Sequence, residues 1–177
     1  MLISPLPEQD FSALIPALSN LLIDCVEAGA SIGFLSPLTV DEATAYWRDL
    51  QADISDGTCL IWVVREGDNI LGTVQLALAT RKNARNRAEV QKLMVASDAR
   101  RRGIAAQLMQ AVESRARQEQ RGLLFLDTEQ DSPAEAFYQS LGYQRVGVIP
   151  DFACSPQGDL RGTAIYYKLI GARDTQA

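Results

Sequence analysis

A strand, a short loop and a helix follow one another directly over residues 88–107, and this stretch constrains the fold more than any other. Residues 88–95 have the pattern of a strand, and a loop with three arginines at 100–102 and Gly103 leads into the helix. The first N–H groups of a helix have no partner inside it, and the helix dipole favours anions at that end. The stretch therefore predicts a binding site for a phosphate-bearing ligand.

Composition limits the chemistry that such a site can perform. The chain contains no histidine, which excludes Ser-His and Cys-His triads and every histidine-ligated metal site. Its three cysteines, Cys25, Cys59 and Cys154, lack C-x-x-C spacing, so neither a disulfide framework nor a zinc site is predicted. We expect no bound metal, and proton transfer is left to carboxylates, tyrosine, cysteine or water.

Charge and hydropathy exclude two classes of partner. A formal net charge of -5 and a pI near 4.8 argue against general nucleic-acid binding, which needs a basic face. No run approaches the roughly 18 apolar residues of a membrane span, and the first residues do not resemble a signal peptide, so we expect a cytoplasmic protein without a membrane partner. Basic residues nevertheless cluster at 81–87 and 100–102, so local phosphate binding remains compatible with the overall acidity.

Hydrophobic periodicity predicts one α/β domain over residues 1–177. Thr39 with Glu42 forms a capping-box pattern at the start of the second helix, and Ser132 is a candidate cap for the last. We expect a loop over 150–162, and we expect the last strand to be an edge strand that could mediate a homodimer. The predicted strands are 2–4, 58–66, 70–79, 87–95, 123–127, 143–149 and 163–169, and the predicted helices are 8–28, 39–54, 104–120 and 132–140.

At the arginine loop the sequence resembles a known superfamily. Arg100-x-x-Gly103-x-Ala105, between a strand and a helix, is similar to the [Arg/Gln]-x-x-Gly-x-[Gly/Ala] signature of the GNAT superfamily of N-acetyltransferases, which use acetyl-CoA. Residues 134–143, Ala-Glu-Ala-Phe-Tyr-Gln-Ser-Leu-Gly-Tyr, resemble the A-x-x-F-Y-x-x-x-G-[FY] block of the same superfamily. The resemblance covers residues 88 to about 146 and implies a GNAT fold, with a mixed, mostly antiparallel twisted sheet of about seven strands flanked by about four helices.

A closer resemblance extends over most of the chain. Segments 29–34, 86–95, 121–124, 126–129 and 163–166 are similar to the tabtoxin-resistance acetyltransferase and its relatives, which acetylate an amino group of a small β-lactam-type toxin. This implies a small-molecule amine as acceptor, with amino-acid-like compounds, toxins and antibiotics as candidates. Two alternatives stay open: acetylation of a protein N-terminus or lysine, and a non-catalytic acetyl-CoA-binding sensor module.

The superfamily resemblance also implies where coenzyme A binds. Backbone N–H groups at the start of the helix would hold the pyrophosphate, and the backbone of the preceding strand would pair with the pantetheine arm. The cofactor-binding residues implied are Leu93, Met94, Val95, Arg100, Arg101, Arg102, Gly103, Ile104, Ala105, Ala106, Ser132, Ala134, Phe137 and Tyr138.

Three residues are candidates for the chemistry of acetyl transfer. The amine must lose its proton before it attacks, and Glu89 stands where several GNAT enzymes hold a glutamate base. Strand alternation predicts that Glu89 shares a face with Gln91 and Leu93. Asp127, at the end of an apolar strand, could anchor the substrate ammonium or share the role of base, and a helix cap or salt bridge is its structural alternative. Tyr138 matches the tyrosine that many members place near the thioester sulfur, with aromatic packing as its alternative.

The acceptor site is the part of the protein that the sequence defines least. Candidates for its walls are Ile32, Phe34, Trp47, Trp62 and Gln75, with core packing as the alternative for each. The basic cluster at 81–87 could meet the 3′-phosphate of coenzyme A or an anionic substrate, with a solvated loop as its alternative.

Overall fold

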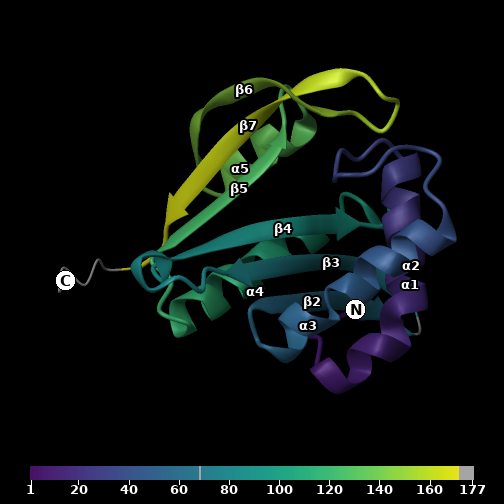
Figure 1. Cartoon of the computed structure of the whole chain (residues 1–177), viewed down its shortest axis with the longest axis horizontal. Helices are drawn as coiled ribbons and strands as arrows, with labels where there is room; N and C mark the ends of the chain where they lie inside the picture. Colours follow the sequence, from purple (N-terminus) through teal and green to yellow (C-terminus); the bar gives the residue numbers. More distant parts are fainter. Residues whose placement is uncertain (68, 172–177) are drawn as a thin grey trace.

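The computed structural model describes residues 1–67 and 69–171, and its strands form one seven-stranded sheet in the order β1-β2-β3-β4-β5-β7-β6 (Figure 1). The neighbouring strands are antiparallel except for β4 and β5, as the GNAT resemblance implied. The strands are β1 (Leu2–Pro5), β2 (Cys59–Glu66), β3 (Asn69–Leu78), β4 (Arg87–Val95), β5 (Leu123–Glu129), β6 (Gln144–Cys154) and β7 (Leu160–Leu169). The helices are α1 (Glu8–Glu27), α2 (Val40–Asp49), α3 (Gln51–Ser55), α4 (Ile104–Gln118) and α5 (Pro133–Ser140), with 3₁₀ turns η1 (Lys82–Ala84) and η2 (Ser97–Ala99).

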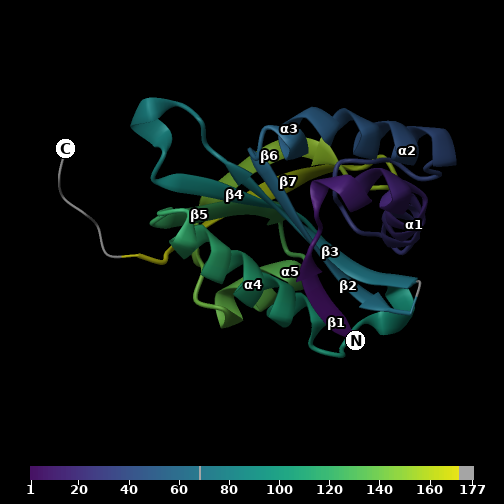
Figure 2. The ribbon, with the colours of Figure 1, turned by 90° about the horizontal axis from the view of Figure 1, so that it is seen from below.

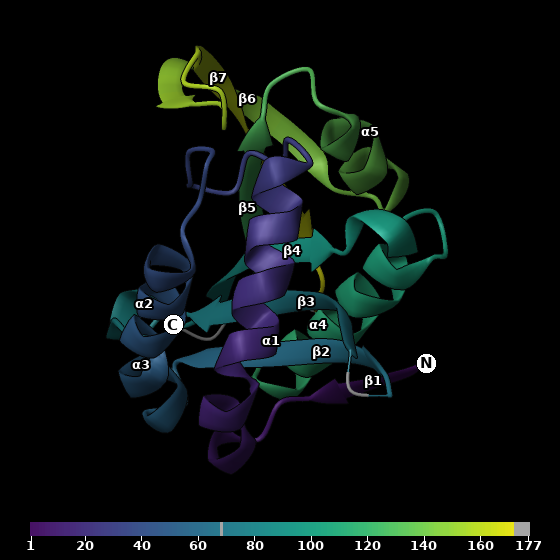
Figure 3. The ribbon, with the colours of Figure 1, turned by 90° about the vertical axis from the view of Figure 1, so that its right-hand side faces the viewer.

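The helices cover the sheet in two layers. In Figures 2 and 3, α1, α2 and α3 lie on one face, here called the α1 face, and α4 and α5 lie on the other, the α4 face. Each face has its own hydrophobic core, with Phe11, Leu18 and Trp47 on the α1 face and Leu108 and Leu126 on the α4 face. Among the described residues, none of the helices combines the length and apolar character needed to cross a bilayer.

Two predictions about the elements are wrong. The helix expected to reach Ile54 is divided at Leu50 into α2 and α3, although the predicted capping box of Thr39 and Glu42 is present. The loop expected over 150–162 is mostly strand, because the pairing of β6 with β7 resumes at Ala153 after an irregularity that accommodates Pro150.

The position of the last strand also differs from the prediction. β7 is internal, and the edges of the sheet are β1 and β6. A homodimer formed by strand addition would therefore have to use β1 or β6.

β4 and β5 separate along most of their length, and this separation organises the site. They pair only at Arg87–Leu123, Ala88–Leu124 and Glu89–Phe125. Beyond these pairs, β4 continues to Val95 while β5 diverges from it, as Figure 1 shows. The carboxyl half of β4 therefore presents backbone groups that β5 does not pair.

A β-bulge at Lys92 reverses the alternation of β4. Thr73 pairs with Met94 and Gln75 with Gln91, so two residues of β4 stand opposite one residue of β3. Lys92 adopts a left-handed φ of 49° at this point. Met94 consequently packs in the core of the α1 face, and Leu93 packs against the core of the α4 face. The prediction that Leu93 shares a face with Glu89 is therefore wrong.

Candidate functional site

A cavity of about 200 Å³ lies at the carboxyl end of β4, where β5 has diverged. Eight of its ten lining residues are among those that the superfamily resemblance implied for coenzyme A. The other two come from α1, whose pattern predicted core packing, and from the loop after it, whose small residues beside Phe34 and Leu35 indicated either contact with a ligand or a plain connection between helices. The lining residues are Leu93, Met94, Val95, Arg100, Ala105, Ala134, Phe137 and Tyr138, together with the unpredicted Cys25 and Ala30.

The start of α4 lies beside this cavity and offers unpaired N–H groups. Gly103 has a φ of 78°, a left-handed conformation that glycine adopts without strain. The first helical hydrogen bond runs from Gln107 N to Gly103 O, so the N–H groups of residues 103–106 have no partner within the helix. This end of α4 can accept the oxygens of a pyrophosphate.

The three arginines of the loop point in different directions. Arg100 lines the cavity. Arg102 donates from Nη2 to Glu66 Oε1 at 3.1 Å, on the outside of the fold, and Arg101 is exposed. Only Arg100 therefore brings its side chain to the cavity. If Arg101 and Arg102 contribute to cofactor binding, they do so outside the cavity lining.

Tyr138 projects from α5 into the same cavity. Its ring packs against Phe137, Tyr143 and Tyr166. Burial, reinforced by the negative charge of Asp127, raises the pKa of Tyr138 to about 12, so the phenol keeps its proton at neutral pH. Aromatic packing and proton donation are compatible at this position. Ser132 begins α5 but makes no capping hydrogen bond, and it does not line the cavity.

Glu89 and Asp127 lie on the α1 face of the separating strands. Glu89 stands opposite Phe125, and Asp127 follows two residues later on β5, while Leu124 and Leu126 point into the opposite core. Glu89 is half-buried and Asp127 is exposed. Within the described residues, Asp127 makes neither the helix-capping hydrogen bond nor the salt bridge that was its structural alternative.

Lys92, which is not among the residues predicted from the sequence, joins these two carboxylates on the same face. Its Nζ lies 5.9 Å from the ring centroid of Phe34 and 5.5 Å from that of Tyr46. Burial lowers the pKa of Lys92, although the charges of Asp127 and Glu89 act in the opposite direction. No sequence signal marked the lysine, because only the bulge brings it to this face.

The predicted walls of the acceptor site are only partly brought together. Phe34 packs edge to face on Tyr46, with ring centroids 5.3 Å apart, and Ile32 packs against the same core. Gln75 is 0% exposed and shares hydrogen bonds of 2.9 and 3.1 Å with the hydroxyl of Tyr46. Gln75 therefore supports the aromatic pair from behind rather than forming a wall.

The two tryptophans are core residues. Trp47 is 0% exposed in the core of the α1 face, and Trp62 is 6% exposed in the core of the α4 face. The prediction that they line the acceptor site is wrong. Tyr46, the neighbour of Trp47 on α2, takes the position that the prediction gave to the tryptophan, because successive helical residues point about 100° apart.

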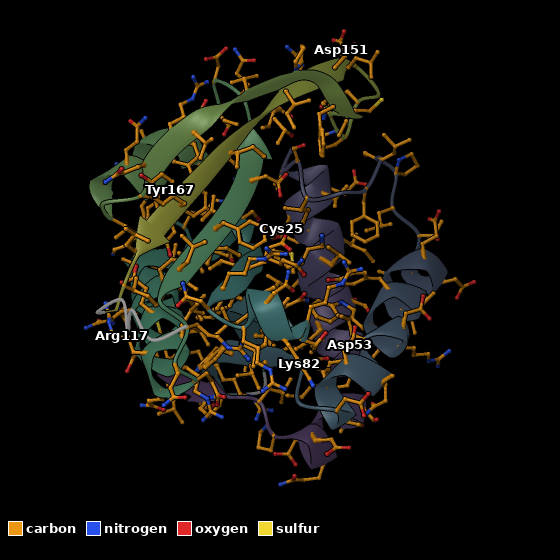
Figure 4. All side chains as sticks on the ribbon, turned by 60° about the vertical axis from the view of Figure 1, so that its left-hand side comes forward. Cys25, Asp53, Lys82, Arg117, Asp151 and Tyr167 are labelled. Carbon is orange, nitrogen blue, oxygen red and sulfur yellow. The ribbon has the colours of Figure 1, made fainter. Side chains whose placement is uncertain are left out.

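The basic segment 81–87 lies at the amino end of β4. From Arg87 to Val95, at the end near the start of α4, the nine residues of β4 span eight rises of roughly 3.3 Å, about 26 Å in all. Figure 4 shows Lys82 of this segment well apart from Cys25 of the cavity. The segment therefore lies at the opposite end of β4 from the start of α4, and with Arg121 it borders a separate cavity of about 450 Å³.

Comparison with known proteins identifies the family. The model of the acetyltransferase (GNAT) family matches residues 21–143, more than half of the chain. Among solved structures, ribosomal-protein-alanine N-acetyltransferase from Brucella melitensis is 21% identical with a TM-score of 0.75, and the match covers 96% of this chain and 99% of that one. The structure of yncA from Salmonella typhimurium with its cofactor acetyl-CoA is 15% identical with a TM-score of 0.76, covering 100% and 98%. Aminoglycoside 6'-acetyltransferase type Ii is 20% identical with a TM-score of 0.72, covering 98% and 99%. At these identities the structures show a shared fold, and the family match shows that the chain belongs to the GNAT family of acetyltransferases.

Proposed function

We propose that this protein transfers the acetyl group of acetyl-CoA to the primary amine of a small molecule, in one step within a ternary complex. The observation that carries the proposal is the cavity at the carboxyl end of β4, where β5 has diverged, which is lined by Ala105 near the start of α4 and by Tyr138. A ligand with both an anionic end and an extended, amide-containing arm fits such a site.

Acetyl-CoA has these two parts. The N–H groups at the start of α4, with the Arg100 side chain nearby, would hold the pyrophosphate. The backbone of Leu93, Met94 and Val95, on the side of β4 that β5 does not pair, would hold the pantetheine arm, which can form hydrogen bonds as a strand does. The Salmonella structure with acetyl-CoA, which shares the fold, supports this placement.

The proposed reaction needs three proton transfers. The acceptor ammonium loses a proton to Glu89, directly or through water, with Asp127 holding the ammonium or sharing the role of base. The amine nitrogen then attacks the thioester carbon, the C–S bond breaks, and Tyr138 donates its proton to the departing thiolate. The nitrogen loses its second proton as the amide forms, and this proton returns to the Tyr138 phenolate, directly or through water. Backbone N–H groups of Met94 or Val95 would stabilise the oxyanion, and holding both substrates together would supply a large part of the rate.

A small acceptor is favoured over a protein by the loop between α1 and α2. Ser36 N donates to Pro156 O at 2.8 Å, which ties this loop to the turn between β6 and β7 across the open side of the separated strands. This bridge leaves an extended peptide less access than a small amine. The similarity to the tabtoxin-resistance acetyltransferase and the fold shared with an aminoglycoside acetyltransferase point to the same class of acceptor.

The test is thiol release from acetyl-CoA in the presence of a panel of small amines and of peptides. We expect turnover with small amines, and we expect Tyr138→Phe and Glu89→Gln each to lower kcat by about 10²-fold or more while acetyl-CoA binding is retained. Tyr167→Phe is the matched control, because the Tyr167 hydroxyl donates to Gln144 on the edge strand. Turnover with peptides alone would favour the protein acetyltransferase. Failure of every amine and peptide, with acetyl-CoA still bound, would favour the sensor module.

A further inference from the structure

Lys92 reaches the acceptor side of the sheet only because β4 is bulged. In a regular strand, residue 92 would point opposite to Glu89 and Gln91, into the apolar core of the α4 face. The left-handed φ of 49° at Lys92 instead sends its side chain to the α1 face, over the Phe34 and Tyr46 rings. A left-handed conformation is unfavourable for lysine, so the fold maintains this position against a local cost.

Within residues 1–67 and 69–171, the ammonium of Lys92 has no direct anionic partner. Among the described residues, no carboxylate oxygen lies within 4.0 Å of its Nζ, and the Nζ makes no hydrogen bond. Lys168 provides a contrast, because its half-buried Nζ lies 2.7 and 2.9 Å from the Glu113 oxygens. The loop between α1 and α2 passes close by, since a Cβ built on Gly33 would lie 3.6 Å from the Lys92 Nζ. A half-buried cation without a hydrogen bond to any described residue has its hydrogen-bonding capacity free for a ligand.

The charges around Lys92 are complementary to a zwitterion. Glu89 and Asp127 lie on the same face, close enough for their charges to act on Lys92, yet neither is paired with it. The two carboxylates suit the ammonium of an incoming acceptor. Lys92 would repel that ammonium unless the acceptor also carried a negative group to meet it.

We propose that Lys92 binds a carboxylate of the acceptor, so that the enzyme selects amines carrying a carboxylate near the reacting nitrogen. This inference rests on the proposed acetyltransferase function and adds a residue that determines specificity. Lys92 positions the acceptor, with its Nζ on the carboxylate, while Glu89 and Asp127 face the amine. Dicationic and polycationic amines are disfavoured at such a site.

The first experiment compares each amino acid with its carboxamide, which keeps the amine but lacks the negative charge. The wild-type enzyme should prefer the carboxylate of each accepted pair by about tenfold or more in kcat/KM. Lys92→Met, which keeps the apolar stem, should raise the KM for the carboxylate by about 10–100-fold and leave the carboxamide within about threefold. Lys92→Arg should retain part of the preference, and Lys82→Met, in the distant basic segment, should leave it unchanged.

The second experiment does not depend on turnover. N-acetylglycine and N-acetylglycinamide are titrated calorimetrically into the enzyme with coenzyme A bound, and only N-acetylglycine should lose affinity in Lys92→Met. If no amine is acetylated but this difference is present, the proposed function fails and the role of Lys92 stands. The inference would be overturned if Lys92→Met lost equal affinity for the carboxylate and the carboxamide of a pair, or if the wild-type enzyme did not prefer the carboxylate. Lys92 would then only support the Phe34 and Tyr46 rings. Thermal unfolding of Lys92→Met checks that the fold is intact.

Discussion

Gly72 of β3 lies where the end of β4 and the start of α4 press together, and replacing it with alanine should affect both stability and cofactor binding. A Cβ at this position would lie 2.9 Å from Met94 O, 3.0 Å from Ile104 Cγ2 and 3.3 Å from Leu108 Cδ1. The two side chains can yield by a few tenths of an ångström, but the Met94 carbonyl belongs to the backbone that borders the cavity. Overpacking of this kind destabilises a protein by about 1–3 kcal/mol. Alanine has less conformational entropy than glycine in the unfolded chain, and this difference offsets about 0.4–1 kcal/mol of that loss.

We therefore expect Gly72→Ala to lose about 1–2 kcal/mol, which for a chain of this length lowers the Tm by about 2–8 °C. The shift of the Met94 carbonyl should also raise the KM for acetyl-CoA. Gly147→Ala in β6 is the control, because a Cβ there meets nothing within 4 Å. Differential scanning calorimetry and initial-rate kinetics measure both effects. If Gly72→Ala proves as stable as the wild type, or Gly147→Ala loses as much, the steric reasoning is wrong.

Three other expectations address the helix start, pH and the thiols. At Gly103, with a φ of 78°, an added Cβ would make only an ordinary van der Waals contact, 3.8 Å from Gln107 Nε2. Gly103→Ala should therefore lose about 1–2 kcal/mol through backbone strain and weaken acetyl-CoA binding, as chemical denaturation and calorimetric titration would show. Burial would raise the pKa of Glu135, but hydrogen bonds, the largest from Tyr166, outweigh it and lower the pKa. The ionised Glu135 carboxylate thus stabilises the fold above its unfolded pKa of about 4.3, and this stabilisation is lost as the pH falls through its lower folded pKa. The difference in Tm between Glu135→Gln and the wild type should therefore disappear below about pH 4. Burial raises the pKa of Cys25 to about 11 and that of Cys59 to about 12, whereas Cys154 is exposed. A thiol reagent should therefore modify only Cys154 in the folded protein and all three cysteines after unfolding. Rapid modification of Cys25 in the folded protein would contradict its burial.

The cofactor half of the site was predictable because it depends on local sequence. A strand, a loop with Gly103 and a helix start are contiguous, so their chemistry can be read without knowing the rest of the fold. The second motif places Ala134, Phe137 and Tyr138 on one short helix, and the structure brings all three to the same cavity as the residues of β4. The order of strands and helices was predicted for the same reason, since each element has its own periodicity.

The acceptor half was less predictable because it depends on where one strand departs from regularity. The bulge at Lys92 moves Leu93 away from Glu89 and brings a lysine into its place, and neither change is visible in an alternating apolar pattern. The tryptophans were misplaced because a large aromatic residue has the same appearance in a sequence whether it lines a site or fills a core. Trp62 even packs on the face opposite to Phe34.

The short joint between β4 and β5 has a consequence for folding. Three residue pairs connect the β1–β4 part of the sheet to the β5–β7–β6 part, whereas strands within each part pair along most of their length. Such a division favours two cooperative units that open separately in native-state hydrogen exchange. The amide hydrogens of the β4–β5 pairs would then exchange at the rate at which the less stable unit opens. A ligand held between β4 and β5 would slow this exchange, because it would link the opening of one unit to that of the other.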